Sequence, residues 1–173
     1  VWDVSREREL YSGLFSAQGK SACVLAHEIN DAIIVALTGR PGIASSRIVY
    51  ADRSRGEYRL WVIDSAGDNR RSIYACDFLV NYPRWFPDGK KVLFLSYRSG
   101  YPRLEALDLA SGAWSIFLAE PGLNACASFF RRSEKVAVVL SKSGNPEIYL
   151  ADYHGKVLTR LTEHAAVDAS PSV

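Results

Sequence analysis

Apolar and polar residues alternate along short runs of this chain, and one such pattern occurs three times at a constant interval. The stretches that begin at Arg47, Lys91 and Lys135 lie 44 residues apart and align without a gap over about thirty columns. A glycine and an aspartate recur in fixed columns, at Gly56, Gly100 and Gly144 and at Asp64, Asp108 and Asp152. A fixed period of this length indicates an internal structural repeat.

Each repeat contains four runs that are typical of β-strands. In the first repeat, residues 47–53 and 58–64 alternate and are separated by a turn sequence that contains glycine. A third strand is predicted at about 70–75, 114–119 and 157–162, and a fourth is the short run that ends at Trp85, Phe129 or Val173. The "PDGK" that follows Phe86 predicts a hairpin turn into the second repeat. Four antiparallel strands in a period of roughly 40–45 residues are typical of one β-propeller blade.

The repeat count predicts a mainly β fold with about three four-stranded blades, which is a partial β-propeller. Three blades cannot close a ring, because known propellers have about four to eight. An incomplete ring leaves two apolar blade faces open, and exposed apolar patches of that size drive association. We therefore expect self-association, in which two three-bladed halves complete one six-bladed ring.

The residues before Arg47 do not share the repeat. The first of them, "VWDV" and "ELYSGLFSA", predict a β-hairpin. From about residue 20 to residue 37 the apolar residues fall on one face at helical spacing, and Thr38-Gly39 followed by Pro41 predicts the end of that helix. We therefore divide the chain into residues 1–43, the end of an α/β domain, and residues 44–173, a partial propeller whose blades repeat at 47, 91 and 135.

Composition excludes several classes of protein. The 173 residues are 48% hydrophobic and 23% charged, with a net charge of +2, so neither disorder nor a nucleic-acid partner is indicated. No apolar run approaches the ~20 residues of a membrane span, so we expect contact with membranes only through partners. Because the chain lacks methionine, we expect Val1 not to be a natural start. Three distant cysteines, Cys23, Cys76 and Cys126, predict buried free thiols.

Few residues in the sequence suggest a catalytic or ligand-binding role. There is no G-x-S-x-G motif, glycine-rich phosphate loop or metal-ligand spacing, so we predict no catalytic residue, cofactor or metal. The recurring aspartates, and Asp88 in "PDGK", are expected to accept hydrogen bonds from the backbone of their own turns. His27 is expected to make a polar contact where the two parts of the chain meet, and His154 to lie in an exposed turn. Three tryptophans are expected to pack between blades, namely Trp61, Trp85 and Trp114.

Two stretches carry a resemblance to a known family. The junction "AHEINDAIIVALTGRPGIASSRIVYA" and the segment "WFPDGKKVLFLS" resemble the TolB family of periplasmic propeller proteins. The resemblance implies a six-bladed propeller in full, no catalysis, and interaction with the lipoprotein Pal and other Tol proteins in support of outer-membrane integrity and constriction during cell division. The second segment is also similar to the regulatory propeller of prolyl-oligopeptidase-like serine peptidases, which stays open as an alternative.

The resemblance also implies a binding face. The family receives Pal at one mouth of the propeller channel, where the connections at 77–82, 121–126 and 163–170 are predicted to lie. The residues expected to bind the partner are Asn81, Leu123, Asn124, His164, Val167 and Asp168. Their mixture of apolar, amide and acidic side chains suits a protein partner. Leu123 departs from the family pattern, which often has histidine before the asparagine.

Overall fold

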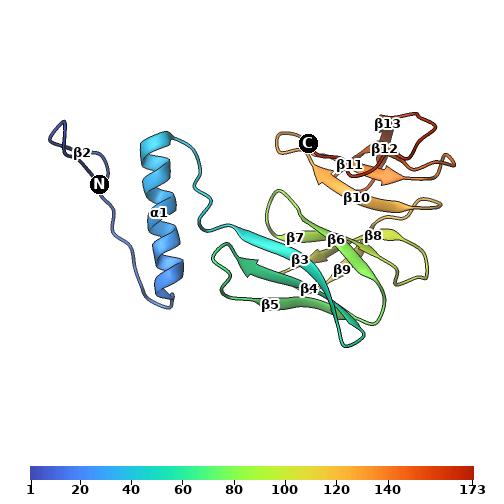
Figure 1. Ribbon diagram of the computed structural model, residues 1–173, viewed down its shortest axis with the longest axis horizontal. Helices are drawn as coiled ribbons and strands as arrows, with labels where there is room; N and C mark the ends of the chain where they lie inside the picture. The colour runs from blue at the N-terminus through green and yellow to red at the C-terminus, as the bar shows by residue number, and fades with distance from the viewer. The chain divides into compact units, whose positions relative to one another are not determined.

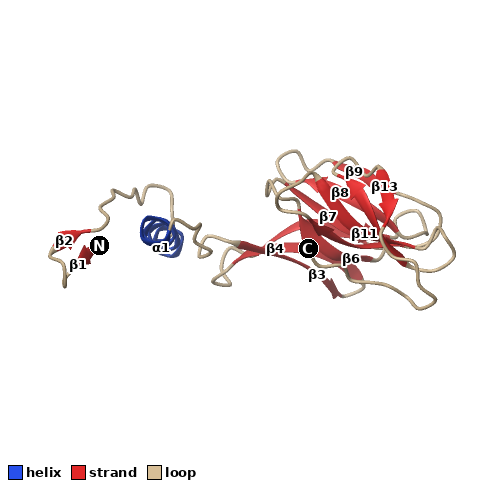
Figure 2. Cartoon of the chain, turned by 90° about the horizontal axis from the view of Figure 1, so that it is seen from above, coloured by secondary structure: helices blue, strands red, loops and turns tan.

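Strands make up most of the regular structure in the computed structural model, which describes residues 1–173 (Figure 1). The chain divides into two compact units. The first comprises Val1–Ile48 with Ile63–Arg70, and the second comprises Val49–Val62 with Arg71–Val173. The single helix belongs to the first unit, and the second unit consists of strands and loops (Figure 2). No helix has the length and apolar character needed to cross a membrane.

The first unit contains a short hairpin and helix α1 (Ala22–Thr38). Strands β1 (Trp2–Asp3) and β2 (Arg8–Glu9) pair antiparallel, as the sequence predicts. The hydroxyl of Ser21 accepts a hydrogen bond from the Val24 backbone N–H at the start of α1, and Gly39 ends the helix with a φ of 67°. The Asp31 carboxylate accepts the backbone N–H groups of Ala44 and Ser45, both at 2.8 Å. The Ser45 side chain and these two backbone groups lower the pKa of Asp31. Asp31 thereby fixes the chain that leaves the helix.

The remaining strands form three antiparallel sheets, each with its strands in sequence order. The first sheet contains β3 (Arg47–Ser54), β4 (Glu57–Asp64) and β5 (Arg71–Cys76). The second contains β6 (Val80–Trp85), β7 (Lys91–Ser96), β8 (Arg103–Asp108) and β9 (Trp114–Leu118). The third contains β10 (Asn124–Phe129), β11 (Lys135–Leu140), β12 (Glu147–Asp152) and β13 (Val157–Arg160). The partial propeller predicted from the sequence is confirmed.

The sheets are offset from the sequence repeats by one strand, which corrects the expected blade composition. The run that ends at Trp85 pairs with β7, and the run that ends at Phe129 pairs with β11. The fourth strand of each repeat is thus the first strand of the next sheet. For this reason the first sheet has three strands, and the run that ends at Val173 pairs with no strand of residues 1–173.

Two apolar clusters hold the sheets face to face. Because side chains alternate along a strand, Val92 and Phe94 of β7 face the first sheet, whereas Leu93 faces the third. All three side chains are completely buried. On the third sheet, Val136 and Val138 join the same cluster as Leu93. Burial on both faces explains the continuous apolar runs in β7 and β11.

The recurring aspartates bind the backbone of their own turns, as predicted. One Asp108 oxygen accepts the N–H groups of Ala110 and Ser111, and one Asp152 oxygen accepts those of His154 and Lys156, all at 2.9–3.1 Å. These hydrogen bonds lower the pKa of both carboxyl groups. Asp64 accepts the Asp68 N–H at 2.8 Å, and Asp88 accepts the Lys90 N–H at 2.9 Å.

Two other sequence expectations need correction. The three cysteines are free thiols, but each is only partly buried. Trp114 is 43% exposed and does not pack between sheets. Its ring instead lies 3.8 Å from the guanidinium carbon of Arg98, which is a cation–π contact. The reason is its position on β9, the outermost strand of the second sheet, where one side of the strand faces solvent.

Candidate functional site

Several connections between strands lie together at one end of the sheets. Because neighbouring strands are antiparallel, the β5–β6, β7–β8, β9–β10 and β11–β12 connections share one end with the segment that follows β13. We call this the rim end, and the opposite end, which carries the aspartate turns, the far end. The three stretches expected to form the binding face, 77–82, 121–126 and 163–170, all lie at the rim end.

A pocket of about 390 Å³ opens at the rim end, and we call it the rim pocket. Nine of its residues are three sets of equivalent positions in the three repeats: Leu79, Leu123 and Val167; Asn81, Ala125 and Ala169; and Tyr82, Cys126 and Ser170. Leu95, Tyr97, Val139 and Pro146 complete the lining, so no charged side chain takes part. The internal repeat therefore builds the pocket from the same three columns of each repeat.

The third of these columns has an unusual backbone. Tyr82, Cys126 and Ser170 have positive φ angles of 50°, 47° and 58°. In β6 and β10 the irregular residue lies in a β-bulge, between Asn81 and Arg84 and between Ala125 and Ser128. A bulge redirects side chains locally, and here it lies where the inner strands reach the pocket. None of these residues is a glycine or an asparagine, so their own residue types did not signal the positive φ.

Three of the six predicted binding residues line the rim pocket. Asn81 is exposed, Leu123 is half-buried and Val167 is 63% exposed. Ser141 fixes Leu123 from the neighbouring strand end, because its Oγ accepts the Leu123 N–H at 2.7 Å and its own N–H donates to the Leu123 carbonyl at 3.1 Å. The structure therefore brings Asn81, Leu123 and Val167 together at one site.

The other three predicted residues lie outside the pocket lining. Asn124 is 99% buried, and its amide holds the loop before it: Nδ2 donates to the carbonyls of Pro102, Glu120 and Gly122, and Oδ1 accepts the Glu120 N–H. The ring of His164 is exposed, with Nδ1 accepting the Ala166 N–H. Asp168 is half-buried, and its N–H donates to the Pro146 carbonyl. Asn124 therefore fixes the conformation of the β9–β10 connection from a buried position and does not face solvent.

Glu147 is a rim residue that sequence reasoning missed. Its side chain is completely buried and accepts hydrogen bonds from Arg160 Nη2 at 2.9 Å, Thr162 Oγ1 at 2.6 Å and the His164 N–H at 2.9 Å. These bonds lower the pKa of Glu147 to about 2. Asn145 adds two more bonds, from Nδ2 to the carbonyls of His164 and Ala166. We call Asn145 and Glu147 the latch, because together they fix the segment that presents Val167.

The chemistry of the site is that of a contact surface. The rim pocket offers aliphatic, aromatic and amide groups, which are the side chains that fit another protein. No group of three or more histidine, cysteine, aspartate or glutamate side chains lies close enough together to hold a metal ion. Lys142 and Glu120, two charged residues of this end, pair with each other at 3.4 Å and lie outside the rim pocket lining.

Comparison with known proteins agrees with this architecture. Residues 35–173 match the family described as the TolB beta propeller domain. The Tol-Pal system protein TolB of Anaeromyxobacter dehalogenans strain 2CP-C is 29% identical over 99% of this chain and 39% of its own length. The protein of the same name from Polaromonas naphthalenivorans is 33% identical over 65% of this chain and 26% of its own length.

Solved structures show the same relationship. The crystal structure of TolB from Acinetobacter baumannii matches with a TM-score of 0.82 and 29% identity, covering 99% of this chain and 44% of that one. Puromycin hydrolase matches with a TM-score of 0.59 at 16% identity over 73% of this chain and 22% of that one, which shows the fold alone. This chain spans less than half the length of the TolB proteins that it matches. It belongs to the TolB β-propeller family.

Proposed function

We propose that this chain is a non-catalytic protein-interaction propeller of the Tol–Pal system in the periplasm. In this proposal the rim pocket binds the lipoprotein Pal, and the interaction supports outer-membrane integrity and constriction during cell division. The proposal rests on one observation: Leu79, Leu123 and Val167, from the same column of three repeats, converge on an uncharged pocket of about 390 Å³. Membership of the TolB β-propeller family is the reason for proposing Pal as the partner.

The lining determines what kind of contact this site can make. Leu123 is half-buried and Val167 is 63% exposed, so both have apolar surface left to cover. The absence of charge in the lining favours an apolar side chain of the partner, inserted between these residues, over an ion pair. Asn81 is exposed at the edge and can both donate and accept a hydrogen bond. Residues at the centre of such a contact carry most of its binding energy.

The test replaces Leu123 with aspartate and measures Pal binding by calorimetry. Removing a central apolar contact and adding a charge should weaken binding by roughly tenfold or more, since central contacts often contribute ~2 kcal/mol. The control is Arg132→Gln, an exposed change at the far end. A thermal melt of each variant checks the fold. Unchanged binding by Leu123→Asp with an unchanged melt places the interface elsewhere.

Should Leu123→Asp lower the melting temperature, Val167→Asp decides the question. Val167 is the equivalent residue of the third repeat and is more exposed, so a charge there leaves the sheets intact. Loss of Pal binding by this variant supports the rim pocket, and full binding by it contradicts the proposal. The peptidase alternative draws support only from a likeness at 16% identity, which is a likeness of fold.

We also propose that the chain self-associates through its open sheet face. On the second sheet, Leu104 and Ala106 are buried in the cluster shared with the third sheet. Their equivalents in the third repeat, Ile148 and Leu150, are only partly buried. A second copy of the chain offers a matching blade face, and two copies of three blades complete a six-bladed ring. Light scattering should therefore report a dimer, and a strict monomer at high concentration contradicts this proposal.

A further inference from the structure

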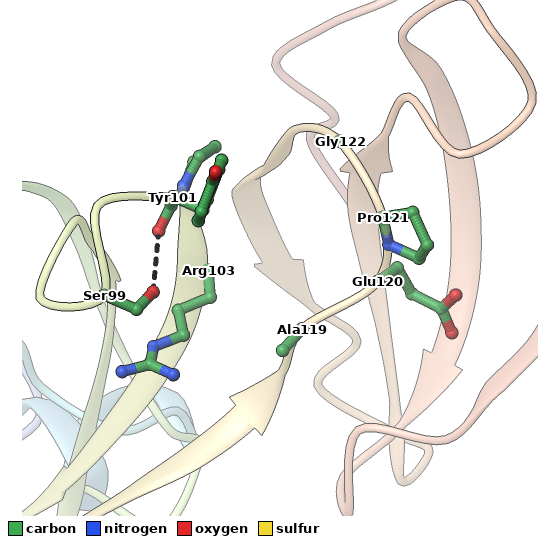
Figure 3. Close-up of a pocket in the computed structure, with 8 residues that line it drawn as sticks. Ser99, Tyr101, Arg103, Ala119, Glu120, Pro121 and Gly122 are labelled. Atoms are coloured by element: carbon green, nitrogen blue, oxygen red, sulfur yellow. Dashed lines mark hydrogen bonds between the residues drawn. The ribbon is translucent and has the colours of Figure 1, made fainter.

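A second pocket at the rim end, of about 330 Å³, lies between the β7–β8 and β9–β10 connections, and we call it the side pocket. One wall carries Ser99, Tyr101, Pro102 and Arg103, and the other is the segment 119–122 (Figure 3). Figure 3 shows the Glu120 side chain directed away from Arg103. Glu120 instead pairs with Lys142 at 3.4 Å. None of the six residues predicted to bind a partner lines the side pocket.

The internal repeat shows what occupies this position elsewhere in the same molecule. The third-repeat equivalents of Tyr101 and Arg103 are Asn145 and Glu147, which form the latch. The latch bridges the two walls, because Asn145 donates to the carbonyls of His164 and Ala166 and Glu147 accepts the His164 N–H. The third sheet therefore closes the equivalent space with an amide and a carboxylate from its own chain.

In the second sheet the equivalent backbone groups are hydrogen-bonded by a buried side chain, Asn124, and not by residues of the β7–β8 connection. Glu120 and Gly122 are the equivalents of His164 and Ala166, and Asn124 binds the N–H and carbonyl of Glu120 and the carbonyl of Gly122. Asn124 also donates to the Pro102 carbonyl of the other wall, so it joins the two walls from the core side, and Tyr101 is 77% exposed. The side pocket is thus a space that the third sheet closes and the second sheet leaves open.

The side pocket is lined by a cationic side chain, Arg103, whereas the equivalent residue of the third sheet, Glu147, is a carboxylate. Glu105 is completely buried and pairs with two arginines, Arg103 through Nε at 3.1 Å and Arg98 through Nε at 3.4 Å. Two guanidinium groups thus share one carboxylate. Arg98 also donates through Nη2 to the Tyr74 hydroxyl. Arg103 uses only Nε within the chain, so its two Nη groups keep their donors for a further acceptor.

From this comparison we propose that the side pocket binds the carboxylate side chain of an acidic segment in a partner protein. The carboxylate accepts hydrogen bonds from the Nη groups of Arg103, while Tyr101, Pro102 and Pro121 cover the aliphatic part of the side chain. Arginine and carboxylate pair well because the planar guanidinium offers parallel donors. The site extends beyond the proposed function, because it is separate from the rim pocket and its test does not involve Pal.

A small probe tests the proposal. N-acetyl-glutamate N-methylamide is titrated into the 173-residue chain and followed through amide chemical shifts in NMR. We expect shifts confined to segments 99–103 and 119–122, and none with the neutral N-acetyl-glutamine N-methylamide. Equal shifts with both probes, or shifts only at other segments, overturn the proposal.

Two variants and a control sharpen the test. Arg103→Gln should weaken binding of the glutamate probe by about tenfold, the usual effect of losing a hydrogen bond to a charged group. Since this change also removes one partner of Glu105, a second variant, Ala119→Trp, fills the pocket from an exposed position without touching the ion pairs. Ala119→Trp should abolish binding, and Arg132→Gln at the far end should not change it. Binding retained by a folded Ala119→Trp variant contradicts the proposal.

Discussion

The second and third sheets follow the same path at the rim end but hold it by different side chains. In the second sheet one buried amide, Asn124, binds the loop from inside. In the third sheet the latch of Asn145 and Glu147 binds the equivalent backbone groups from the other side. A repeat therefore conserves which backbone groups must be satisfied, while the side chain that satisfies them can change.

Which side chains bind this backbone also determines whether the surface beside it is closed or open. The latch occupies the space between the two connections of the third sheet, so that space is closed. Asn124 reaches the same groups from the core side and leaves the side pocket open between Tyr101 and Pro121. The same backbone path therefore has a closed surface in the third sheet and a pocket of about 330 Å³ in the second sheet.

The largest loss of stability is expected for Glu147→Ala. This change leaves Arg160 without its buried acceptor and leaves the His164 N–H without a partner. The loss should exceed that of Asn124→Ala and is measured by urea denaturation. Glu163→Ala is the matched control, because Glu163 also pairs with Arg160, at 3.6 Å, but is 85% exposed. Similar losses in both variants would show that the latch contributes no more than a surface ion pair.

The second prediction concerns Asn124→Ala in the second sheet. Leaving the Glu120 N–H and the carbonyls that Asn124 binds without this partner should cost about 2–3 kcal/mol in the free energy of unfolding. The control is Asp168→Ala in the equivalent column of the third repeat, where the latch replaces the function of Asn124. That change should stay within about 0.5 kcal/mol. A large effect of Asp168→Ala and a small one of Asn124→Ala would reverse the comparison.

The third prediction is a dependence of stability on pH. The pKa of Glu147 is lowered from 4.5 to about 2 in the folded protein. A lowered pKa means that the unfolded chain binds the proton more readily, so this contribution is complete above pH 4.5 and is lost as the pH falls towards 2. Asp108 and Asp152, whose pKa values are also lowered, add to the same trend.

Glu147→Gln isolates the part that belongs to the latch. The free energy of unfolding of this variant should fall less steeply with decreasing pH than that of the unchanged protein. Thermal melts over this acidic range measure the difference. Parallel curves for the two proteins would show that Glu147 does not carry the pH dependence.

The smallest expected effect is that of Tyr101→Asn, which gives the second sheet an asparagine at the position equivalent to Asn145 of the latch. Alone it should change the free energy of unfolding by less than about 0.5 kcal/mol, because Tyr101 is exposed and Asn124 already binds the loop. In the Asn124→Ala background the new amide can donate to the Glu120 and Gly122 carbonyls and should recover about 1 kcal/mol. A double-mutant cycle measures this coupling, and a coupling of zero would show that the two solutions are not interchangeable.

The sequence predicted some features of the rim and missed others. The period of 44 residues placed Leu123 and Val167 in corresponding stretches, and the rim pocket brings them together. Asn124 was predicted to face a partner, but it is 99% buried. An asparagine in a connection reads as a surface residue, because the sequence does not show which backbone groups come within reach of its amide.

The bulges and the latch could not be predicted for a related reason. Tyr82, Cys126 and Ser170 share a positive φ although their own residue types do not favour it, and the bulges at Tyr82 and Cys126 form where β6 and β10 pair with the strands that follow them. Glu147 and its partner Arg160 are 13 residues apart and meet only because β12 and β13 pair. The boundary between sheets was shifted by one strand for the same reason, since the strand that β6 joins lies in the following repeat.

Local sequence determined the elements of this protein. The alternation of apolar residues, the turn glycines and the recurring aspartates act between near neighbours, so the strands, the hairpin turns and the helix that ends at Gly39 follow from the chain itself. Tertiary structure decided which side chains became surface. Whether Asn124, Glu147 or Arg103 is buried, paired or left with donors to spare depends on partners brought close by sheet pairing, and hydrogen bonds and charges act only across such short distances.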